Sequence, residues 1–149
     1  MQGQKEEKMR TLEEVKQFFE NDVYATGTTG IRIEKARPGY AKVSLQLDAR
    51  HMNAAGRVMG AVYYTMADFA FAVANNYDIE ESITVTLSSQ INFLAPARGN
   101  TLFAEARTVK AGGHTTFYTI EVTDDLGTQI ALISSNGFRM KSPAKPAGS

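Results

Sequence analysis

The spacing of apolar residues varies along the chain, and in two segments it is the spacing typical of a helix. Thr11 and Glu14 stand three residues apart, as the reciprocal partners of a helix N-terminus do, and apolar residues follow at helical spacing to about Asn21. A loop is expected at 27–30. The longer run, 58–74, reads V-M-G-A-V-Y-Y-T-M-A-D-F-A-F-A-V-A. Because this run is apolar almost all round, we expect its helix to be enclosed by the rest of the fold.

Alternation of apolar and polar residues, typical of strands, occurs before and after the long helix. Two strands are expected before it, at 31–33 and 41–47, joined by a turn at 37–39. Four further segments follow the helix: 83–93, 102–109, 115–123 and 128–140. Short turns between such strands favour an antiparallel sheet. The pattern therefore predicts an α+β fold with one sheet packed on one long helix.

The ends of the chain differ in composition from its middle. Residues 1–10 are polar and 141–149 resemble a linker, so both are expected to be disordered around a single domain at 11–140. The first residues contain no apolar signal segment, which favours a cytoplasmic location. The longest apolar run carries a central acid and is slightly short for a membrane span, so no membrane partner is expected.

Composition removes several classes of function. Lys and Arg together number 16, as do Asp and Glu, and this balance argues against duplex DNA or an anionic membrane as a partner. The absence of cysteine excludes disulfides, cysteine zinc sites and cysteine nucleophiles. His51 and His114 lie far apart without a zinc motif, so no metal site is expected and both are interpreted as ordinary loop residues. Nucleophile-elbow, phosphate-loop and dinucleotide motifs are also missing.

Asp68 is the only ionisable acid in the apolar run, and a residue of this kind is expected to have a hydrogen-bond partner or a functional role. Burial of an ionised carboxylate is costly and raises its pKa, which makes it a better general base on water. Gly60, near the helix start, offers a backbone N–H to a developing oxyanion, and Asn53 could orient the water or the carboxylate. These groups suit hydrolysis of an activated acyl group. The alternative is a structural acid, solvated or bonded to a hydroxyl such as that of Thr65.

Gly60 and Asp68 are eight residues apart, which is about 12 Å along a helix axis. They cannot touch the same reacting atom from one helix. If both act, we expect the site to be shared between two antiparallel subunits.

The stretch H-M-N-A-A-G-R-V-M-G-A, followed by T-M-A-D, resembles the N-x-x-G-x-x-H-G-G…D signature of hotdog-fold acyl-CoA thioesterases of the phenylacetic-acid-degradation (PaaI) type. Asn53, Gly56, Gly60 and Asp68 stand at the matching spacings. The segments T-V-T-L-S-S-Q-I-N-F-L-A-P and V-K-A-G-G-H-T-T-F-Y resemble the following strands and hairpin, so the resemblance covers about residues 29–140.

The resemblance implies a hotdog fold, an antiparallel sheet wrapped round the long helix, in homodimers or homotetramers with active sites at the dimer interface. It implies acyl-CoA as substrate and no cofactor. Asp68 would be the base or nucleophile, Gly60 the oxyanion donor and Asn53 a positioning group, while Thr86 would hold the water. Substrate contacts are expected from five further residues: Gly56, Met59, Gly112, Gly113 and His114.

Two departures from the family pattern bear on function. Met59 stands where the signature has histidine, and a thioether donates no hydrogen bond. Residues 111–114 read A-G-G-H where the family often has glycine followed by Arg or Lys near the CoA. The CoA phosphates would then meet other cations, or the substrate would not be a CoA ester; the candidate cations are Arg57, Arg98 and Lys110.

Three other functions stay open on the sequence. The first is an acyl-CoA binding module that has lost efficient turnover, which Met59 motivates. The second is a ligand sensor tied to DNA binding, although one short N-terminal helix is too little for a helix-turn-helix. The third is a hydratase or dehydratase, which would want a pair of histidine and acid. Fold analogy alone does not choose among them.

Overall fold

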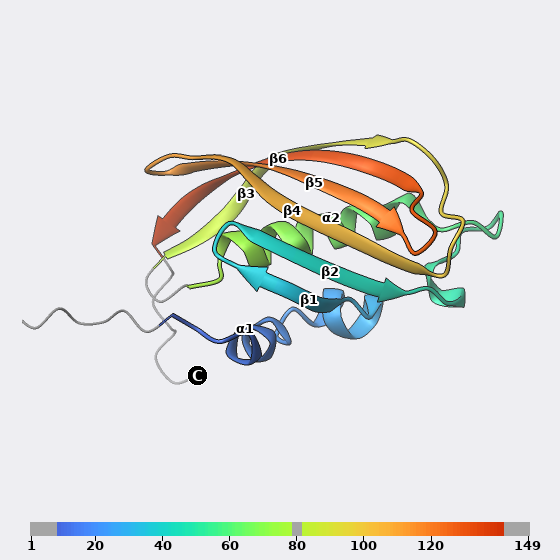
Figure 1. Cartoon of the computed structure of the whole chain (residues 1–149), viewed down its shortest axis with the longest axis horizontal. Helices are drawn as coiled ribbons and strands as arrows, with labels where there is room; N and C mark the ends of the chain where they lie inside the picture. Colours follow the sequence, from blue (N-terminus) through green and yellow to red (C-terminus); the bar gives the residue numbers. More distant parts are fainter. Residues whose placement is uncertain (1–8, 79–81, 142–149) are drawn as a thin grey trace, which may run out of the picture.

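A single antiparallel sheet curls around one long helix in the computed structural model, which describes residues 9–78 and 82–141 (Figure 1). The helix, α2, spans Gly60–Asn75. The strand order in the described part is β1-β2-β4-β5-β6-β3, with every neighbouring pair antiparallel. The strands are β1 (Arg32–Arg37), β2 (Tyr40–Gln46), β3 (Ser82–Phe93), β4 (Thr101–Ala111), β5 (Thr115–Asp124) and β6 (Gln129–Lys141). The predicted α+β arrangement is confirmed.

The N-terminal region forms two short helical segments below the sheet. Helix α1 (Leu12–Phe19) starts as predicted, with the Thr11 hydroxyl accepting a hydrogen bond from the Glu14 N–H at 3.2 Å. The loop expected at 27–30 is wrong for most of its length, because η1 (Tyr24–Thr29) is a π-helical turn that Gly30 ends at φ +90°. Ala25 and Thr29 are buried under this turn, so it has a packed face that its T-G-T-T composition does not reveal.

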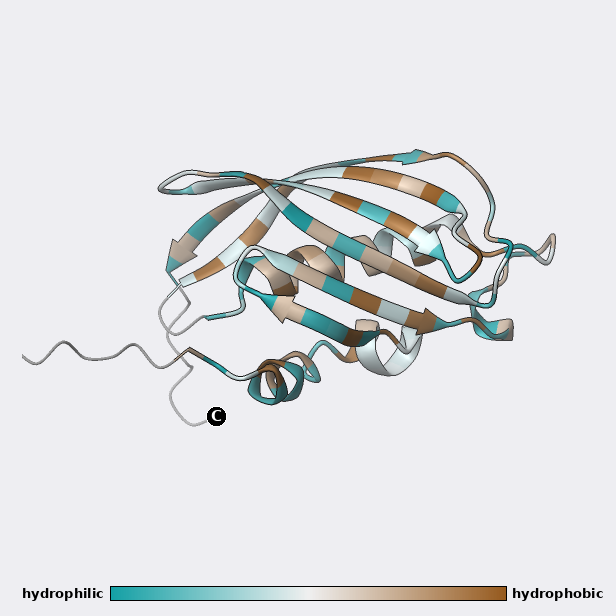
Figure 2. Cartoon of the chain, viewed as in Figure 1, coloured by the Kyte–Doolittle hydropathy of each residue, from teal (hydrophilic) through white to brown (hydrophobic). Residues whose placement is uncertain are grey.

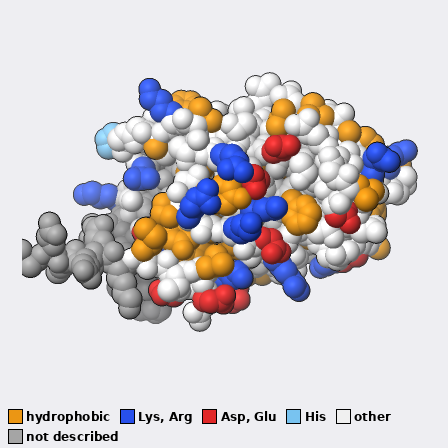
Figure 3. Space-filling view, viewed as in Figure 1, with side chains coloured by type: hydrophobic (Ala, Val, Ile, Leu, Met, Phe, Trp, Pro, Cys, Tyr) orange, Lys and Arg blue, Asp and Glu red, His pale blue; other side chains and the backbone are white. Residues whose placement is uncertain are grey.

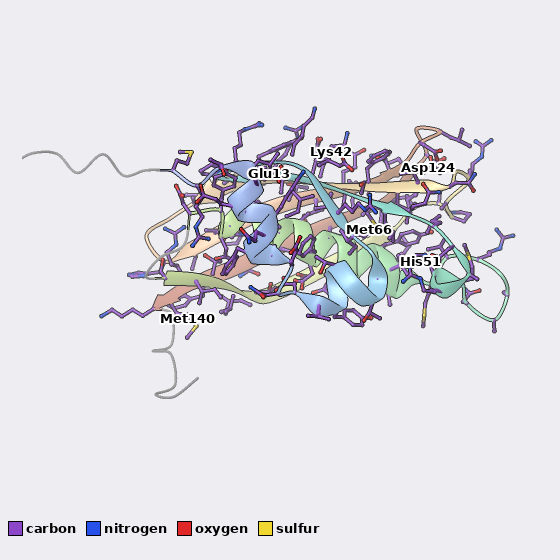
Figure 4. The ribbon with its side chains drawn as sticks, turned by 90° about the horizontal axis from the view of Figure 1, so that it is seen from below. Glu13, Lys42, His51, Met66, Asp124 and Met140 are labelled. Carbon is purple, nitrogen blue, oxygen red and sulfur yellow. The ribbon has the colours of Figure 1, made fainter. Side chains whose placement is uncertain are left out.

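Alternating side chains of the strands build the core against α2. Figure 2 shows this alternation along β5 and β6. Met66 and Phe71 of α2 are almost fully buried, and Figure 4 places Met66 within the molecule. Gly137 of β6 lets the helix come close, because a Cβ there would lie 2.9 Å from the Phe71 ring and 2.7 Å from Thr84 Cγ2. Helix and sheet are therefore in tight contact beside the middle of α2.

The apolar sequence of α2 had predicted a helix enclosed on every side. In the single chain this prediction is wrong for one side of the helix. Ala61, Tyr64 and Asp68 are exposed in the single chain and follow one another at helical spacing. This open stripe exists because the sheet ends at β3, which among the described strands has β6 on one side and no neighbour on the other. We call Ala61, Tyr64 and Asp68 the open stripe of α2.

The predicted disordered ends lie mostly outside the described residues, which exclude 1–8 and 142–149. Residue Arg10 is described, and its carbonyl accepts a hydrogen bond from the Tyr77 hydroxyl at 3.0 Å. Its N–H donates to Asp78 at 3.1 Å. Among residues 9–78 and 82–141, no helix combines the length and the apolar character needed to cross a membrane.

Candidate active site

Asp68 and Thr86 meet where the middle of α2 faces β3. The Thr86 hydroxyl donates a hydrogen bond to Asp68 Oδ1 at 3.3 Å. Thr86 faces the helix because it stands opposite Gly137 in the register of β3 and β6, on the inner face of the sheet. The Thr65 hydroxyl, the alternative partner for Asp68, donates instead to the Ala61 carbonyl at 2.8 Å. Two of the residues chosen from the sequence, 18 positions apart in the chain, thus come together.

Burial raises the pKa of the Asp68 carboxyl above its ordinary value, and the Thr86 hydrogen bond offsets only part of that rise. The side chain nevertheless keeps an exposed face in the single chain. A carboxylate with raised proton affinity that water can reach has the properties of a general base.

The N-terminus of α2 carries an unpaired donor. Gly60 is the first helical residue and Met59, in extended conformation, is its N-cap without a capping side chain. In the part of the chain that the structure describes, no group accepts the Gly60 N–H. A Cβ on Gly60 would lie 3.1 Å from the Phe93 ring, so a larger residue would displace that ring. An N–H at a helix start, free of a side chain, is suited to stabilising an anionic oxygen.

Asn53 and Gly56 shape the loop that leads to this helix start. The Asn53 Oδ1 accepts hydrogen bonds from the Ala55 N–H at 2.9 Å and the Arg57 N–H at 3.1 Å. Gly56 sits at φ +75°, a left-handed conformation that favours glycine. The Asn53 Nδ2 has no acceptor among the described residues. The oxygen of Asn53 therefore holds the loop, while its amide N–H groups stay available to a ligand.

His51 anchors the same loop, a role that the sequence did not indicate. The imidazole is 2% exposed, its Nδ1 accepts the Asp48 N–H at 3.0 Å, and its Nε2 therefore donates to the Thr29 carbonyl at 2.8 Å. The Met59 N–H donates to the His51 carbonyl at 2.9 Å. His51 is thus a buried structural residue rather than an ordinary loop residue, and it ties the approach to α2 to η1.

Asp124, the last residue of β5, and Asp125 after it hold the other loop at this end of the molecule, which carries the chain from β3 to β4. Asp124 Oδ2 accepts the Arg98 and Gly99 N–H groups at 2.8 and 2.9 Å. The Tyr63 hydroxyl of α2 accepts the Ala97 N–H at 3.3 Å. Figure 4 shows Asp124 and His51 at one end of the molecule and Met140 at the other. The sequence had predicted only a short turn between the strands expected at 115–123 and 128–140.

The predicted substrate-binding hairpin lies far from the helix start within one chain. Gly112, Gly113 and His114 join β4 to β5 at the end where α2 finishes, since Thr116 donates to Asn75 at 2.9 Å. The His114 ring stacks on Phe138 at a centroid distance of 5.9 Å. A single chain therefore places the candidate residues in three groups, at the start, middle and end of α2. The separation of Gly60 from Asp68, about 12 Å along the helix axis, had indicated the first two groups.

Cations gather on the outer face of β1, β2 and β4 (Figure 3). The guanidinium groups of Arg37 and Arg107 lie 4.0 and 5.0 Å from the centre of the Tyr40 ring. The neighbouring Ala41 points to the core, so these cations lie on the face of the sheet opposite α2. The described residues also contain no group of three His, Cys, Asp or Glu side chains that could hold a metal ion.

The chain matches the family model described as the thioesterase superfamily over residues 55–131, which includes the helix start, Asp68 and Thr86. The chain belongs to the thioesterase superfamily. A putative esterase of Archaeoglobus fulgidus is 30% identical over 93% of this thioesterase and 90% of the relative. The acyl-coenzyme A thioesterase PaaI of Escherichia coli is 31% identical over 83% of this chain and 86% of its own.

The solved structure of the E. coli PaaI protein from the phenylacetic acid degradation operon superposes on this thioesterase with a TM-score of 0.74. The match has 26% sequence identity and covers 87% of this chain and 96% of that one. The hotdog fold and the PaaI type predicted from the resemblance are therefore confirmed. The family match also covers Met59, so the departure from the signature histidine occurs within the shared region.

Proposed function

We propose that this thioesterase hydrolyses an acyl-CoA, without a cofactor, at a site shared between two copies of the chain. The observation that carries the proposal is the position of Asp68. It is a carboxylate of raised pKa, bonded to Thr86, on the open stripe of α2. The relative PaaI of E. coli, named an acyl-coenzyme A thioesterase, supports CoA esters as the substrate class.

A second copy would supply the oxyanion donor that Asp68 lacks within its own chain. The unpaired edge of β3 and the open stripe of α2 adjoin, and both would be covered by an antiparallel copy. Leu87 and Phe93 of β3 are each 57% exposed, which suits an edge that a partner covers. In such a dimer, Asp68 of one subunit would face the Gly60 N–H of the other.

In the proposed reaction Asp68 takes a proton from water as the water oxygen bonds to the thioester carbonyl carbon. The Gly60 N–H stabilises the negative charge that develops on the carbonyl oxygen. The intermediate collapses with cleavage of the carbon–sulfur bond, and the thiolate leaves as free CoA after gaining a proton. In this scheme Thr86 holds Asp68, and the Asn53 Nδ2 would donate to the water or the carbonyl.

A panel of acyl-CoA esters with a thiol reagent tests this function. We expect release of free CoA that is linear in enzyme concentration for at least one acyl class. Cross-linking or sedimentation should show at least a dimer under the assay conditions. Acyl-CoA binding by calorimetry without CoA release over hours would contradict the proposal and favour a binding protein.

That second candidate is favoured by Met59, which is 53% exposed and offers no hydrogen bond at the helix start. If the lost donor limits turnover, Met59→His should raise kcat about tenfold, because one hydrogen bond to a developing oxyanion is worth at least that factor. The steady-state rate with the best acyl-CoA measures the gain, and Met59→Leu is the matched control, because leucine is similar in size and donates no hydrogen bond. An unchanged kcat in Met59→His would show that Met59 is no obstacle to catalysis.

Asn53→Asp should separate the two uses of the Asn53 side chain. An aspartate oxygen can accept the same two backbone N–H groups, so we expect the melting temperature to change little. The variant loses the amide donor, so kcat/KM should fall about tenfold or more. Parallel melting and kinetic measurements check both statements. Full activity in a stable variant would restrict Asn53 to its role in the loop.

A further inference from the structure

Four cations lie close together on the outer face of the sheet, at the end of the sheet farthest from β3. They are Lys35 and Arg37 of β1, Lys42 of β2 and Arg107 of β4. Because these residues alternate with core residues, their side chains point away from α2, and Figure 3 shows cations gathered on this side of the molecule. We call these four residues the cation face.

The register of the sheet places like charges beside one another on this face. Lys35 stands directly opposite Lys42 on the neighbouring strand. Arg37 and Arg107 stand on either side of Tyr40, in one row across β1, β2 and β4. Like charges directly opposite each other destabilise a sheet. A cost of this kind is expected where a partner of opposite charge compensates it.

Tyr40 holds two of the cations in place. The guanidinium carbons of Arg37 and Arg107 lie 4.0 and 5.0 Å from the centre of the Tyr40 ring, and Tyr40 is only 8% exposed. The Tyr40 hydroxyl donates to Glu105 at 2.7 Å, which fixes the ring from its other end. Contact with a ring face uses none of the N–H donors of a guanidinium. The Arg37 donors therefore remain available to an oxyanion.

One acid, Glu105, lies among the four cations and neutralises only part of their charge. It accepts a hydrogen bond from Arg107, with which it forms an ion pair. Burial would raise the pKa of Glu105, but its hydrogen bonds and the charges of Arg107 and Lys42 hold it below its ordinary value. The side chains of Lys35, Arg37 and Lys42 form no hydrogen bond or ion pair with any residue in 9–78 or 82–141.

The acids at the margins of the cation face have partners of their own. The Glu34 carboxylate accepts a hydrogen bond from the Ser44 hydroxyl, and Glu121 accepts one from Gln129 at 3.3 Å. Three of the four cations are thus left without an ion-pair partner in the described part of the chain. A second copy cannot supply one by a symmetric contact through this face, because cations would then meet cations.

We propose that the cation face binds an anion with two linked phosphoryl groups, as in pyrophosphate. Residues two apart on a strand are separated by about 7 Å and neighbouring strands by about 5 Å, so one small anion can bridge several of the cations. Phosphoryl oxygens match both the fork of a guanidinium and the point charge of a lysine. Four cations and one acid leave an excess of positive charge that suits a multiply charged anion.

This site is separate from the proposed site of acyl-CoA hydrolysis. The cation face lies on the side of the sheet opposite α2, whereas Asp68 and Gly60 belong to α2 itself. It also lies at the end of the sheet away from β3, so the proposed dimer leaves it exposed. Binding to the cation face can therefore be measured whether or not the chain releases CoA.

Calorimetric titration of the full chain with inorganic pyrophosphate tests the proposal. We expect saturable binding of one pyrophosphate per chain. Arg37→Gln and Lys42→Gln should each weaken it about tenfold or more, because each removes a charge-assisted hydrogen bond. Arg37→Lys keeps the charge but loses the fork, so its loss should be smaller than that of Arg37→Gln. Lys16→Gln removes an equal charge from α1, and this control should bind like the parent.

Two results would overturn the proposal directly. One is the absence of saturable binding in the parent, and the other is equal binding in the parent and in Arg37→Gln with an unchanged melting temperature. An equal loss in Lys16→Gln would also overturn it, because net charge alone would then explain the binding. Cosedimentation of the parent with anionic vesicles, without binding of pyrophosphate, would overturn it in favour of a lipid surface.

Titration with ADP distinguishes the two sources of linked phosphoryl groups. An affinity for ADP no higher than that for pyrophosphate indicates an inorganic anion, since the nucleoside then adds nothing. A higher affinity for ADP indicates a nucleotide. Either result supports the proposal only if Arg37→Gln weakens the binding, and an ADP affinity that Arg37→Gln leaves unchanged would place the nucleotide elsewhere and count against it.

Discussion

Replacing Asp68 by asparagine should lower kcat for acyl-CoA hydrolysis by about a thousandfold, because a positioned general base contributes roughly that factor. Asparagine keeps the size of the side chain and can still accept the Thr86 hydrogen bond, which measures 3.3 Å in the parent. The change therefore removes the base and little else. Steady-state release of CoA from the best substrate measures the loss, and Glu121→Gln on the outer face of the sheet is the control.

The same variant should be at least as stable as the parent at neutral pH. Burial raises the pKa of Asp68, so its ionised form is less favourable in the folded chain than in the unfolded one. For such an acid, stability increases as the pH falls through the raised folded pKa toward the unfolded pKa, so the charge destabilises the folded chain at pH 7. Asparagine carries no charge, so the melting temperature should not fall.

A loss of activity without a loss of stability would identify Asp68 as a functional residue, since active-site residues often lower the stability of the folded protein. Loss of both activity and melting temperature would show instead that Asp68 is structural. Full activity in the variant would mean that the base is another group. Single-turnover hydrolysis in isotopically labelled water would further separate a base from a nucleophile, because only a nucleophile leaves the label in Asp68.

Local pattern was sufficient for the two α-helices and the strands of this fold, because the spacing of apolar residues and the turn residues act over a few positions. The strand predicted at 83–93 lies within β3, and the helix predicted at 58–74 became α2 at Gly60–Asn75. The π-helical η1 was missed because its stability comes from burial of Ala25 and Thr29 against distant elements. A polar, glycine-containing string gives no local sign of such packing.

The candidate site was predictable only as far as its motif extends. Asp68, Gly60 and Asn53 could be chosen because spacing along one segment is visible in a sequence. His51 could not, because its role depends on which segments meet in space. The exposure of Asp68 was also missed, since an apolar helix indicates burial but not whether the sheet or a second subunit provides it.

Replacing Asp124 by alanine should lower the free energy of unfolding by about 3 kcal/mol, because it leaves several backbone donors without their charged acceptor. The side chain is 4% exposed and accepts four N–H groups, two on each oxygen, at 2.8 to 3.0 Å. Asp125→Ala is the matched control. Among the described residues its carboxylate accepts only the Asn100 and Thr101 N–H groups, at 3.0 and 3.3 Å, so a loss of about 1 kcal/mol is expected.

Acid titration of stability should then distinguish Asp124, whose pKa is lowered by folding, from Asp68, whose pKa is raised. Burial alone would raise the pKa of Asp124, but the N–H donors outweigh it and hold that pKa well below the ordinary value of 3.8. Its contribution is therefore complete above that value and is lost as the pH falls further. Urea unfolding between pH 7 and 2 should show a weaker acid loss in Asp124→Ala than in the parent. Equal slopes would contradict this account, whereas a steeper fall in Asp68→Asn than in the parent is expected, since that variant lacks the opposing gain.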